Sequence, residues 1–341
     1  MWYVGLDAHL RQSSICVLDE SGRLVRQQTV HGAWDDAVKA ITSLKEPFSV
    51  CYEASCGYGY LHERLSRIAA RVVVAHPGQL RLIFRSKRKN DRVDAQKLAK
   101  LLFLGEVPAV HVPSLDVRSW RGLIEHRGRL IVKRTRVKNS LRALLRTHGM
   151  VRRGLWSQKG MAWLRSVELQ TESDRLRRDL LLEELSEMAA KVHRVDEALE
   201  RIGARQPGVT LLRGIPGVGQ RTAEAFAAYV DNPQRFGHSK CIGSYLGLIP
   251  RQDSSASMNR LGHITRDGPA TVRHLLCEAA WQGVRRSAHI RSYYERILQH
   301  NPERKKIALV ATAHYLARVM LAMLKTGEAW RHDGPVQTAA A

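Results

Sequence analysis

Four carboxylates in the first hundred residues have the types and positions expected of a metal centre. Asp7 and Glu53 each follow a short apolar run, which places each of them at the C-terminal end of an expected strand. Asp91 and Asp94 are three residues apart, a spacing that puts two side chains on one face of a helix. Carboxylates gathered in this way repel one another unless cations lie between them.

Such a group of oxygen ligands suits Mg²⁺ or Mn²⁺. Two ions of this kind can activate an attacking oxygen and stabilise the leaving oxygen in phosphoryl transfer. Flanking cations are expected to hold phosphates beside the metals; they are Arg85, Lys87, Arg88, Lys89 and Arg92. The alternative is that Asp7 merely ends a strand and that Asp91 and Asp94 belong to a solvated helix face.

The elements that must position these carboxylates form a mixed α/β pattern. Three strands (2–7, 14–19 and 24–30) are expected to form an antiparallel meander, and they are followed by a helix (34–44), a strand (48–53), a helix (58–68) and a strand (71–75). This is the element order of an RNase H-like fold. In that fold the first and fourth strands are neighbours, so Asp7 and Glu53 are expected to come together.

The charge of the chain favours a nucleic-acid partner. Its 341 residues include 55 Lys and Arg against 32 Asp and Glu, a formal net charge of +23. Residues 118–153 hold twelve Lys or Arg and a single acid, Glu125. Six cations there are expected to contact a nucleic-acid backbone rather than bases, with a solvated helix face as the alternative: Arg127, Arg129, Lys133, Arg134, Arg136 and Lys138.

The remainder of the chain is expected to be mainly helical, with four parts. These are a RuvC-like catalytic domain (1–115), basic helices and a coiled coil (116–206), a C-terminal domain (207–330) and a loose tail (331–341). Apolar residues at helical spacing between 168 and 202 suit an antiparallel helical pair or coiled coil; they are Leu176, Leu180, Leu185, Met188, Val192, Val195 and Leu199. The apolar segment 307–324 carries His314 and Arg318, which favours a buried helix over a membrane span.

Five scattered cysteines include no Cys-x-x-Cys pair, so neither a zinc ribbon nor a disulfide framework is expected. The first residues lack the basic start and the apolar stretch of a signal peptide. A reducing cytoplasmic location, in a bacterium and close to the nucleoid, and no membrane partner are therefore expected.

Two features of the C-terminal domain could act on DNA. Gly217 and Gly219 lie before an expected helix (220–229), where a hairpin could offer backbone N–H groups to a phosphate. A plain helix–helix turn is an equally good interpretation. Ser254 and Ser255 lie in a polar segment; by composition alone such a pair is usually only part of a loop.

The order of these features resembles a known family. Asp7, Glu53, Asp91 and Asp94 match the DEDD signature of the RuvC-like transposases of bacterial insertion sequences, which are related to the Piv DNA invertases. Segments 246–255 (LGLIPRQDSS) and 262–268 (GHITRDG) resemble the second domain of the same family. The resemblance extends over nearly the whole chain.

The resemblance implies a mechanism that composition does not. Family members recombine target and donor double-stranded DNA with a structured non-coding bridge RNA of their own element. The DEDD site, with Mg²⁺ or Mn²⁺, and a serine of the second domain form a composite active site with a phosphoserine intermediate. The assembly is a dimer of dimers, aided by the coiled coil. The matching serine is Ser255; Ala256 stands where the family usually has glycine, so Ser254 is a second candidate.

Two other functions remain open at this point. A metal-only junction resolvase or nuclease would use the carboxylates and water, without the serine. A non-catalytic nucleic-acid-binding protein with a decayed RNase H-like fold is the second, although a decayed site would be expected to lose its carboxylates first.

Overall fold

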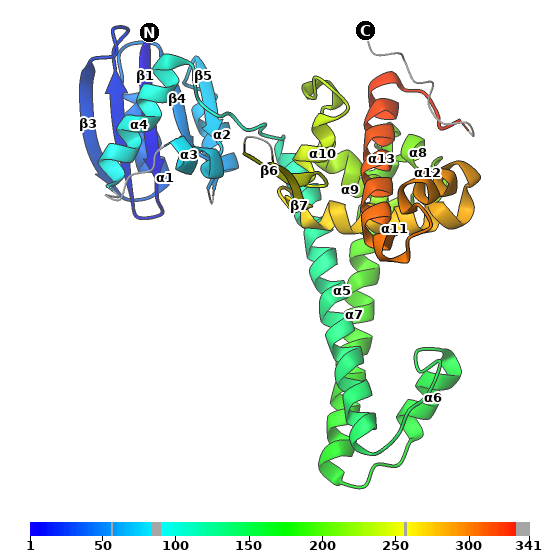
Figure 1. Cartoon of the computed structure of the whole chain (residues 1–341). Coiled ribbons are helices and arrows are strands. Elements are labelled where there is room, and N and C mark those ends of the chain that lie inside the picture. The colour runs from blue at the N-terminus through cyan, green and yellow to red at the C-terminus, as the bar shows by residue number, and fades with distance from the viewer. Residues whose placement is uncertain (56, 84–89, 256–257, 332–341) are drawn as a thin grey trace. The chain divides into compact units, whose positions relative to one another are not determined.

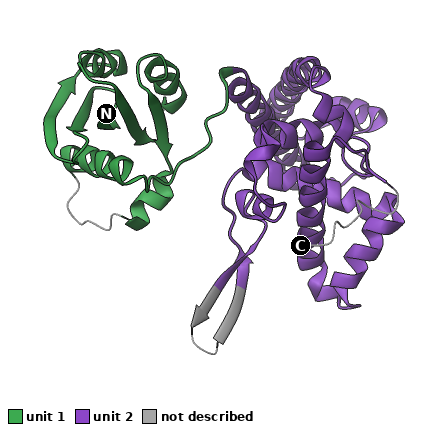
Figure 2. Ribbon diagram, turned by 90° about the horizontal axis from the view of Figure 1, so that it is seen from above, with its two compact units in different colours: residues 1–115 green, residues 116–341 purple. Residues whose placement is uncertain are grey.

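The computed structural model describes residues 1–55, 57–83, 90–255 and 258–331, and for 253–255 and 258–261 it describes the backbone alone. The chain forms two compact units, residues 1–115 and 116–341 (Figure 2). The first unit is a mixed α/β domain and the second is mainly helical, as the sequence predicts.

The first unit is built on a five-stranded sheet in the order β3-β2-β1-β4-β5. Antiparallel pairs join β1 to β2 and β2 to β3, and parallel pairs join β1 to β4 and β4 to β5. The strands are β1 (Trp2–Ala8), β2 (Gln12–Leu18), β3 (Leu24–His31), β4 (Phe48–Glu53) and β5 (Arg71–Ala75). The predicted meander and the predicted proximity of the first and fourth strands are therefore confirmed.

Helices cover both faces of this sheet (Figure 1). They are α1 (Trp34–Thr42), α2 (Tyr58–Leu65), α3 (Pro77–Ile83) and α4 (Asp91–Leu104). Val4 and Leu6 of β1 are buried on the face that α1 and α2 cover, and the alternating residues face α4. A Cβ at Gly5 would lie 2.0 Å from the carbonyl oxygen of Ala95 and 2.5 Å from the amide nitrogen of Ala99. Glycine at this position thus lets α4 pack directly on β1.

The second unit begins with two long helices that run antiparallel (Figure 1). They are α5 (Leu115–Thr147) and α7 (Glu172–Ala204), with α6 (Gln158–Ser166) between them in sequence. Leu130 near the middle of α5 packs with Met188 and Val192 of α7. The predicted antiparallel helical pair is present.

The apolar pattern of α7 is only partly buried against its neighbour. Leu185, Met188, Val192 and Leu199 are buried, whereas Leu176 and Leu180 are 60% and 55% exposed. Here the inclusion of Leu176 and Leu180 in the packed seam was wrong. Arg178, which is 8% exposed, takes the buried position between them and donates to the carbonyl oxygen of Val167 at 2.6 Å.

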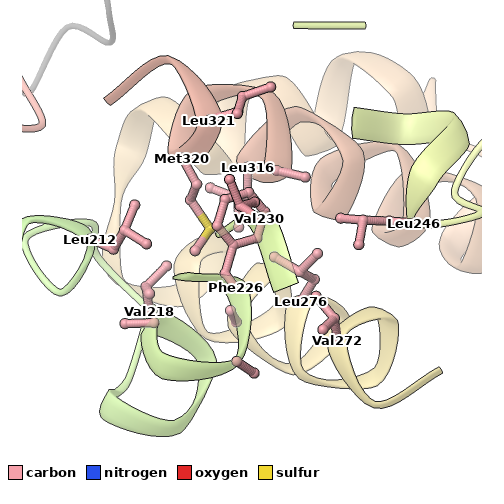
Figure 3. Packing of buried hydrophobic residues seen from close by; sticks show 14 of the residues in the cluster. Leu212, Val218, Phe226, Val230, Leu246, Val272, Leu276, Leu316, Met320 and Leu321 are labelled. Atoms are coloured by element: carbon pink, nitrogen blue, oxygen red, sulfur yellow. The ribbon is translucent and has the colours of Figure 1, made fainter. Parts of the chain in front are cut away.

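The remaining elements surround one large apolar core. They are α8 (Pro207–Leu212), α9 (Gln220–Val230), η1 (Pro233–Arg235), α10 (Cys241–Tyr245), β6 (Pro250–Ser255), β7 (Met258–Ile264), α11 (Ala270–Arg286), α12 (Ala288–Leu298), η2 (Pro302–Arg304) and α13 (Lys305–Thr326). Phe226, Leu276 and Met320 come from three different helices and meet at its centre (Figure 3). Trp120 of α5 and Leu199 of α7 are buried in the same core.

Helix α13 belongs to this core. Segment Pro302–Thr326 is long and apolar enough to cross a membrane by length and composition, a test that core helices also pass. Leu316, Met320 and Leu321 have no exposed surface and pack against the other helices of the core (Figure 3). The structure is that of the buried helix predicted from the sequence.

Candidate metal centre and nucleic-acid surface

The sheet places two of the carboxylates on the face that α4 covers. Asp7 follows Gly5 by two residues on β1, and Glu53 follows Cys51 by two residues on β4. Cys51 packs against α4, and side chains two apart on a strand share a face. The parallel register pairs Leu6 with Tyr52, so Asp7 and Glu53 come next on adjacent strands.

The start of α4 brings the other two carboxylates to the same edge. Asn90 caps the helix by accepting a hydrogen bond from the amide of Arg92 at 3.1 Å. Polar side chains of β2 and β3 hold this first turn: Gln27 donates to the carbonyl oxygen of Arg92, and the Arg92 guanidinium donates to Thr29. Arg92, expected to bind phosphate, thus has an intramolecular partner in this structure.

Three ligand atoms converge at this edge. The candidate ligand atoms of Asp7, His9 and Asp91 all lie within 4.8 Å of one another. His9 Nε2 lies 3.3 Å from Asp7 Oδ2 and 4.0 Å from Asp91 Oδ1. Gln12 Nε2 donates to Asp91 Oδ2 at 3.1 Å. Asp94 lies nearby on α4 and is paired with Lys97 at 3.1 Å.

The electrostatics of Asp7 reflect this crowding. Burial raises the pKa of Asp7 above its ordinary value, and the negative charges of Asp91 and Asp94 raise it further, while His9 opposes the shift. The side chain of Asp7 is only 17% exposed. A cation among these groups would relieve both the repulsion and the loss of hydration.

The donor set therefore fits a divalent cation, with carboxylate oxygens as hard ligands and one imidazole beside them. The structure brings Asp7, Asp91 and Asp94 together. Glu53 lies in the next register position of the adjacent strand, and its ligand atoms are not part of the close group found among the described residues.

Sequence reasoning missed His9 and Gln12. His9 follows Asp7 by two residues at the end of β1, and this Asp-x-His spacing was a usable signal because alternate residues share a side of the strand. Gln12 had no local signal. Its contact with Asp91 joins residues 79 apart in sequence.

The basic helix α5 divides its cations between two roles. Arg127 is paired with Asp196 of α7 through two hydrogen bonds, of 2.5 and 3.2 Å. Arg129, Lys133 and Arg136 are exposed and follow one face of the helix at spacings of four and three residues. In the part of the chain that the structure describes, these three form no ion pair.

A second group of cations lies further along α5. The ammonium of Lys138 and the guanidinium of Arg142 lie 4.8 and 5.2 Å from the centroid of the Trp156 ring. Partial burial lowers the pKa of Lys138, and the charges of Arg134 and Arg142 lower it further. Arg134 is half-buried beside them.

The glycine hairpin packs against the protein. Gly217 has a φ of +95°, and a Cβ there would lie 2.4 Å from the amide nitrogen of Gly283 in α11. Gly217 thus serves the close approach of the turn to α11. Gly219 is the N-cap of α9, and a Cβ there would meet no atom within 4 Å.

The remaining predicted residues have less structural description. Arg85, Lys87, Arg88 and Lys89 lie outside the described residues. Ser254 and Ser255 lie on β6, where their backbone register pairs them with Asn259 and Met258 of β7.

Family models match both halves of the chain. A DEDD transposase model of the IS110 type matches residues 4–150, and a model described as the transposase IS116/IS110/IS902 family matches residues 209–295. The first match includes all four carboxylates, and the second includes both serines.

Curated relatives have the same character. A putative transposase (y4qE) of Sinorhizobium fredii is 30% identical over 288 residues, 82% of this chain and 71% of the relative. A second putative transposase (y4pF/y4sB) of that organism is 29% identical over 305 residues, 86% of this chain and 77% of the relative. The transposase for insertion sequence element IS1111A of Coxiella burnetii is 26% identical over 334 residues, 96% and 91% of the two chains.

Proposed function

The chain belongs to the IS116/IS110/IS902 family of transposases, and we propose that it recombines DNA with a divalent metal, a serine nucleophile and a guide RNA. It is thus an enzyme, the transposase of an insertion sequence. The observation that carries the proposal is the convergence of Asp7, His9 and Asp91 at the edge of an RNase H-like sheet.

Mg²⁺ or Mn²⁺ is the metal that this group favours. Asp7, Glu53, Asp91 and Asp94 would hold it through carboxylate oxygens. When bound, the ion supplies charge stabilisation for a reacting phosphate. The side chains of Gln12 and Gln27 fix the first turn of α4, and so hold Asp91 and Asp94 against the end of β1.

The nucleophile in this proposal is the hydroxyl oxygen of Ser255, with Ser254 as the alternative. Its Oγ–P bond forms as one P–O bond of the DNA strand breaks. The serine proton is lost, and the departing oxygen ends as a free hydroxyl. Attack by the hydroxyl of another strand reverses the step and releases the serine, so rejoining requires no ATP.

The guide RNA and the oligomeric state complete the proposal. The net charge of +23 and the exposed cations of α5 support binding to RNA and DNA backbones. A bridge RNA from the element would pair with target and donor DNA. The exposed Leu176 and Leu180, four residues apart on α7, support a coiled-coil contact with another copy of the chain, as a dimer of dimers requires.

The decisive experiment searches for a covalent protein–DNA link. The protein is incubated with the RNA that co-purifies with it, Mg²⁺ and a labelled DNA substrate, and is then denatured and digested for mass spectrometry. We expect a DNA adduct on Ser255. Ser255→Ala should remove the adduct while RNA binding persists, and Ser257→Ala serves as the matched control.

Other outcomes distinguish the alternatives. An adduct that survives in Ser255→Ala and vanishes in Ser254→Ala moves the nucleophile by one residue. Metal-dependent cleavage that neither serine variant changes supports the metal-only resolvase. Absence of cleavage by the wild-type complex under all metal conditions would support a binding protein without catalysis.

A further inference from the structure

A cavity of about 600 Å³ lies in the second unit where α5, α7, α9 and α11 meet. Its apolar walls include Ile124 and Ile131 of α5, Leu199 of α7 and Leu275 of α11. The volume is within the range of pockets that hold small molecules. None of the catalytic residues proposed above lines it.

The rim of the cavity is cationic. Arg129, Lys133 and Arg136 line one side, are exposed, and are in no ion pair among the described residues. The other side holds Ala270 and Thr271, the first residues of α11, whose N-terminus has no side-chain cap. The positive end of a helix and three cations favour an anion at the mouth.

The polar groups inside the cavity are already neutralised by one another. Glu224 has no exposed surface, accepts from Gln220 at 2.6 Å and lies 3.0 Å from the Arg221 guanidinium. Glu125 accepts from Tyr229 at 2.6 Å and from Thr271 at 2.9 Å. The inner part can therefore take a largely neutral, flat group, while the charge of the ligand stays at the mouth.

Gly128 is the observation that points to an occupant. It lines the cavity from the middle of α5, and a Cβ added there would meet no atom within 4 Å. Alanine would fit the packing and would stabilise the helix by about 1 kcal/mol. Glycine therefore does not serve the packing of the protein. It leaves space, and an open stretch of backbone, inside the cavity.

We propose that this cavity receives one unpaired nucleotide of the bound nucleic acid. Its base would lie against Ile124, Leu199 and Leu275, beside Gly128, and its phosphates would contact Arg129, Lys133 and Arg136. An apolar pocket beside a cationic rim matches a flat base joined to a charged backbone. The inference rests on the proposed nucleic-acid binding, and it adds a base-binding site to a helix expected to contact only the backbone.

The test measures binding to duplexes that carry a single bulged nucleotide, by fluorescence anisotropy in excess chelator. Three labelled duplexes are compared: one with a bulged adenine, one with an abasic bulge and one without a bulge. The abasic bulge bends the duplex without offering a base. Burial of one base is worth a factor of about ten or more in affinity, so the wild type should prefer the adenine bulge to the abasic bulge by that factor. RNA and DNA versions show which strand supplies the nucleotide.

Filling the cavity should remove this preference. Gly128→Leu places a side chain where the base would lie and should bind all three duplexes like the abasic one, with the backbone contacts intact. Gly122→Leu is the matched control, because Gly122 lies on the same helix, is exposed, and also has no atom within 4 Å of an added Cβ. Gly128→Met provides a second, more flexible filling residue, and thermal unfolding checks the fold of each variant.

Each outcome decides a separate question. Equal affinity of the wild type for the adenine and abasic bulges, in both RNA and DNA, overturns the pocket but leaves nucleic-acid binding intact. A preference that survives in both Gly128 variants also overturns it. Absence of binding to any duplex contradicts the proposed function itself. Because the assay contains no metal and no cleavage step, failure of the serine mechanism leaves the result unaffected.

Discussion

Carboxylates in the two units of this transposase are surrounded in opposite ways. In the first unit Asp7 lies against Asp91 and Asp94, and burial together with these two charges raises its pKa. In the second unit Glu125 accepts hydrogen bonds from Tyr229 of α9 and Thr271 of α11, and so joins three helices.

The same contrast extends to the other buried acids of the second unit. Asp196 is held by Arg127 and Arg221, and Glu224 is held by Gln220 and Arg221. Each of these acids lies opposite a donor. A carboxylate with matched donors stabilises the packing of helices, whereas carboxylates that face one another cost free energy until a cation binds. The difference separates a structural acid from a catalytic one without reference to conservation.

The largest expected effect is on DNA cleavage. Each of Asp7→Asn, Glu53→Gln, Asp91→Asn and Asp94→Asn should reduce strand cleavage by about a thousandfold or more, because a divalent cation contributes several kcal/mol to phosphoryl transfer. Glu125→Gln, which keeps an acceptor in the second unit, should retain cleavage. Rates are measured with the protein–RNA complex and labelled DNA. Wild-type rates in the Asp7 and Asp91 variants would show that the cluster is not catalytic.

Metal binding itself should distinguish the two units by thermal unfolding. Mg²⁺ or Mn²⁺ at about a hundred times its dissociation constant should stabilise the first unit by about 2.7 kcal/mol. Chelator should reverse this effect, and Asp91→Asn should abolish it. Replacement of Glu125 should leave the metal-dependent increase unchanged. The same increase in wild type and in Asp91→Asn would locate the ion elsewhere.

Loss of the structural acid should instead unfold the protein more easily. Glu125→Ala leaves the hydroxyls of Tyr229 and Thr271 without their acceptor and should lower the free energy of unfolding by about 2 kcal/mol. Glu125→Gln retains an acceptor oxygen and should cost less than Glu125→Ala. The measurement is urea denaturation of the metal-free protein. Equal stability of Glu125→Ala and wild type would contradict the structural role.

Local patterns were enough to predict most of the first unit. Strand-end positions and alternation gave the placement of Asp7 and Glu53, and the spacing of three gave the shared face of Asp91 and Asp94. Contacts between distant residues were not predictable. Nothing near Gln12 in the sequence indicates a bond to Asp91, and nothing near Glu125 indicates its two donors.

The long helices show the limit of periodicity. Spacing alone placed Leu176 and Leu180 in the same seam as Leu185, but only Leu185 is buried. A helical repeat shows that an apolar face exists, and it does not show how far the neighbouring helix extends along it. The segment between α5 and α7, which includes α6, displaces the partner of α7 at this end: Leu185 packs with Leu164 of α6 as well as with Leu141 of α5.

The smallest predicted effect has the opposite sign and tests the comparison most directly. In chelator at neutral pH, Asp7→Asn should raise the free energy of unfolding by a few tenths to about 1 kcal/mol, the scale of charge interactions near a surface. The pKa of Asp7 is raised in the folded state, so its charge costs stability once the pH rises through that pKa, and the cost is absent at lower pH. The gain should therefore disappear in acid. Excess Mg²⁺ should reverse the order of the two proteins, because the wild type alone then keeps its full set of ligands. Urea denaturation of both proteins across pH, with and without metal, measures all three effects. A loss of stability in metal-free Asp7→Asn similar to that of Glu125→Ala would mean that the first unit's carboxylates are structural as well.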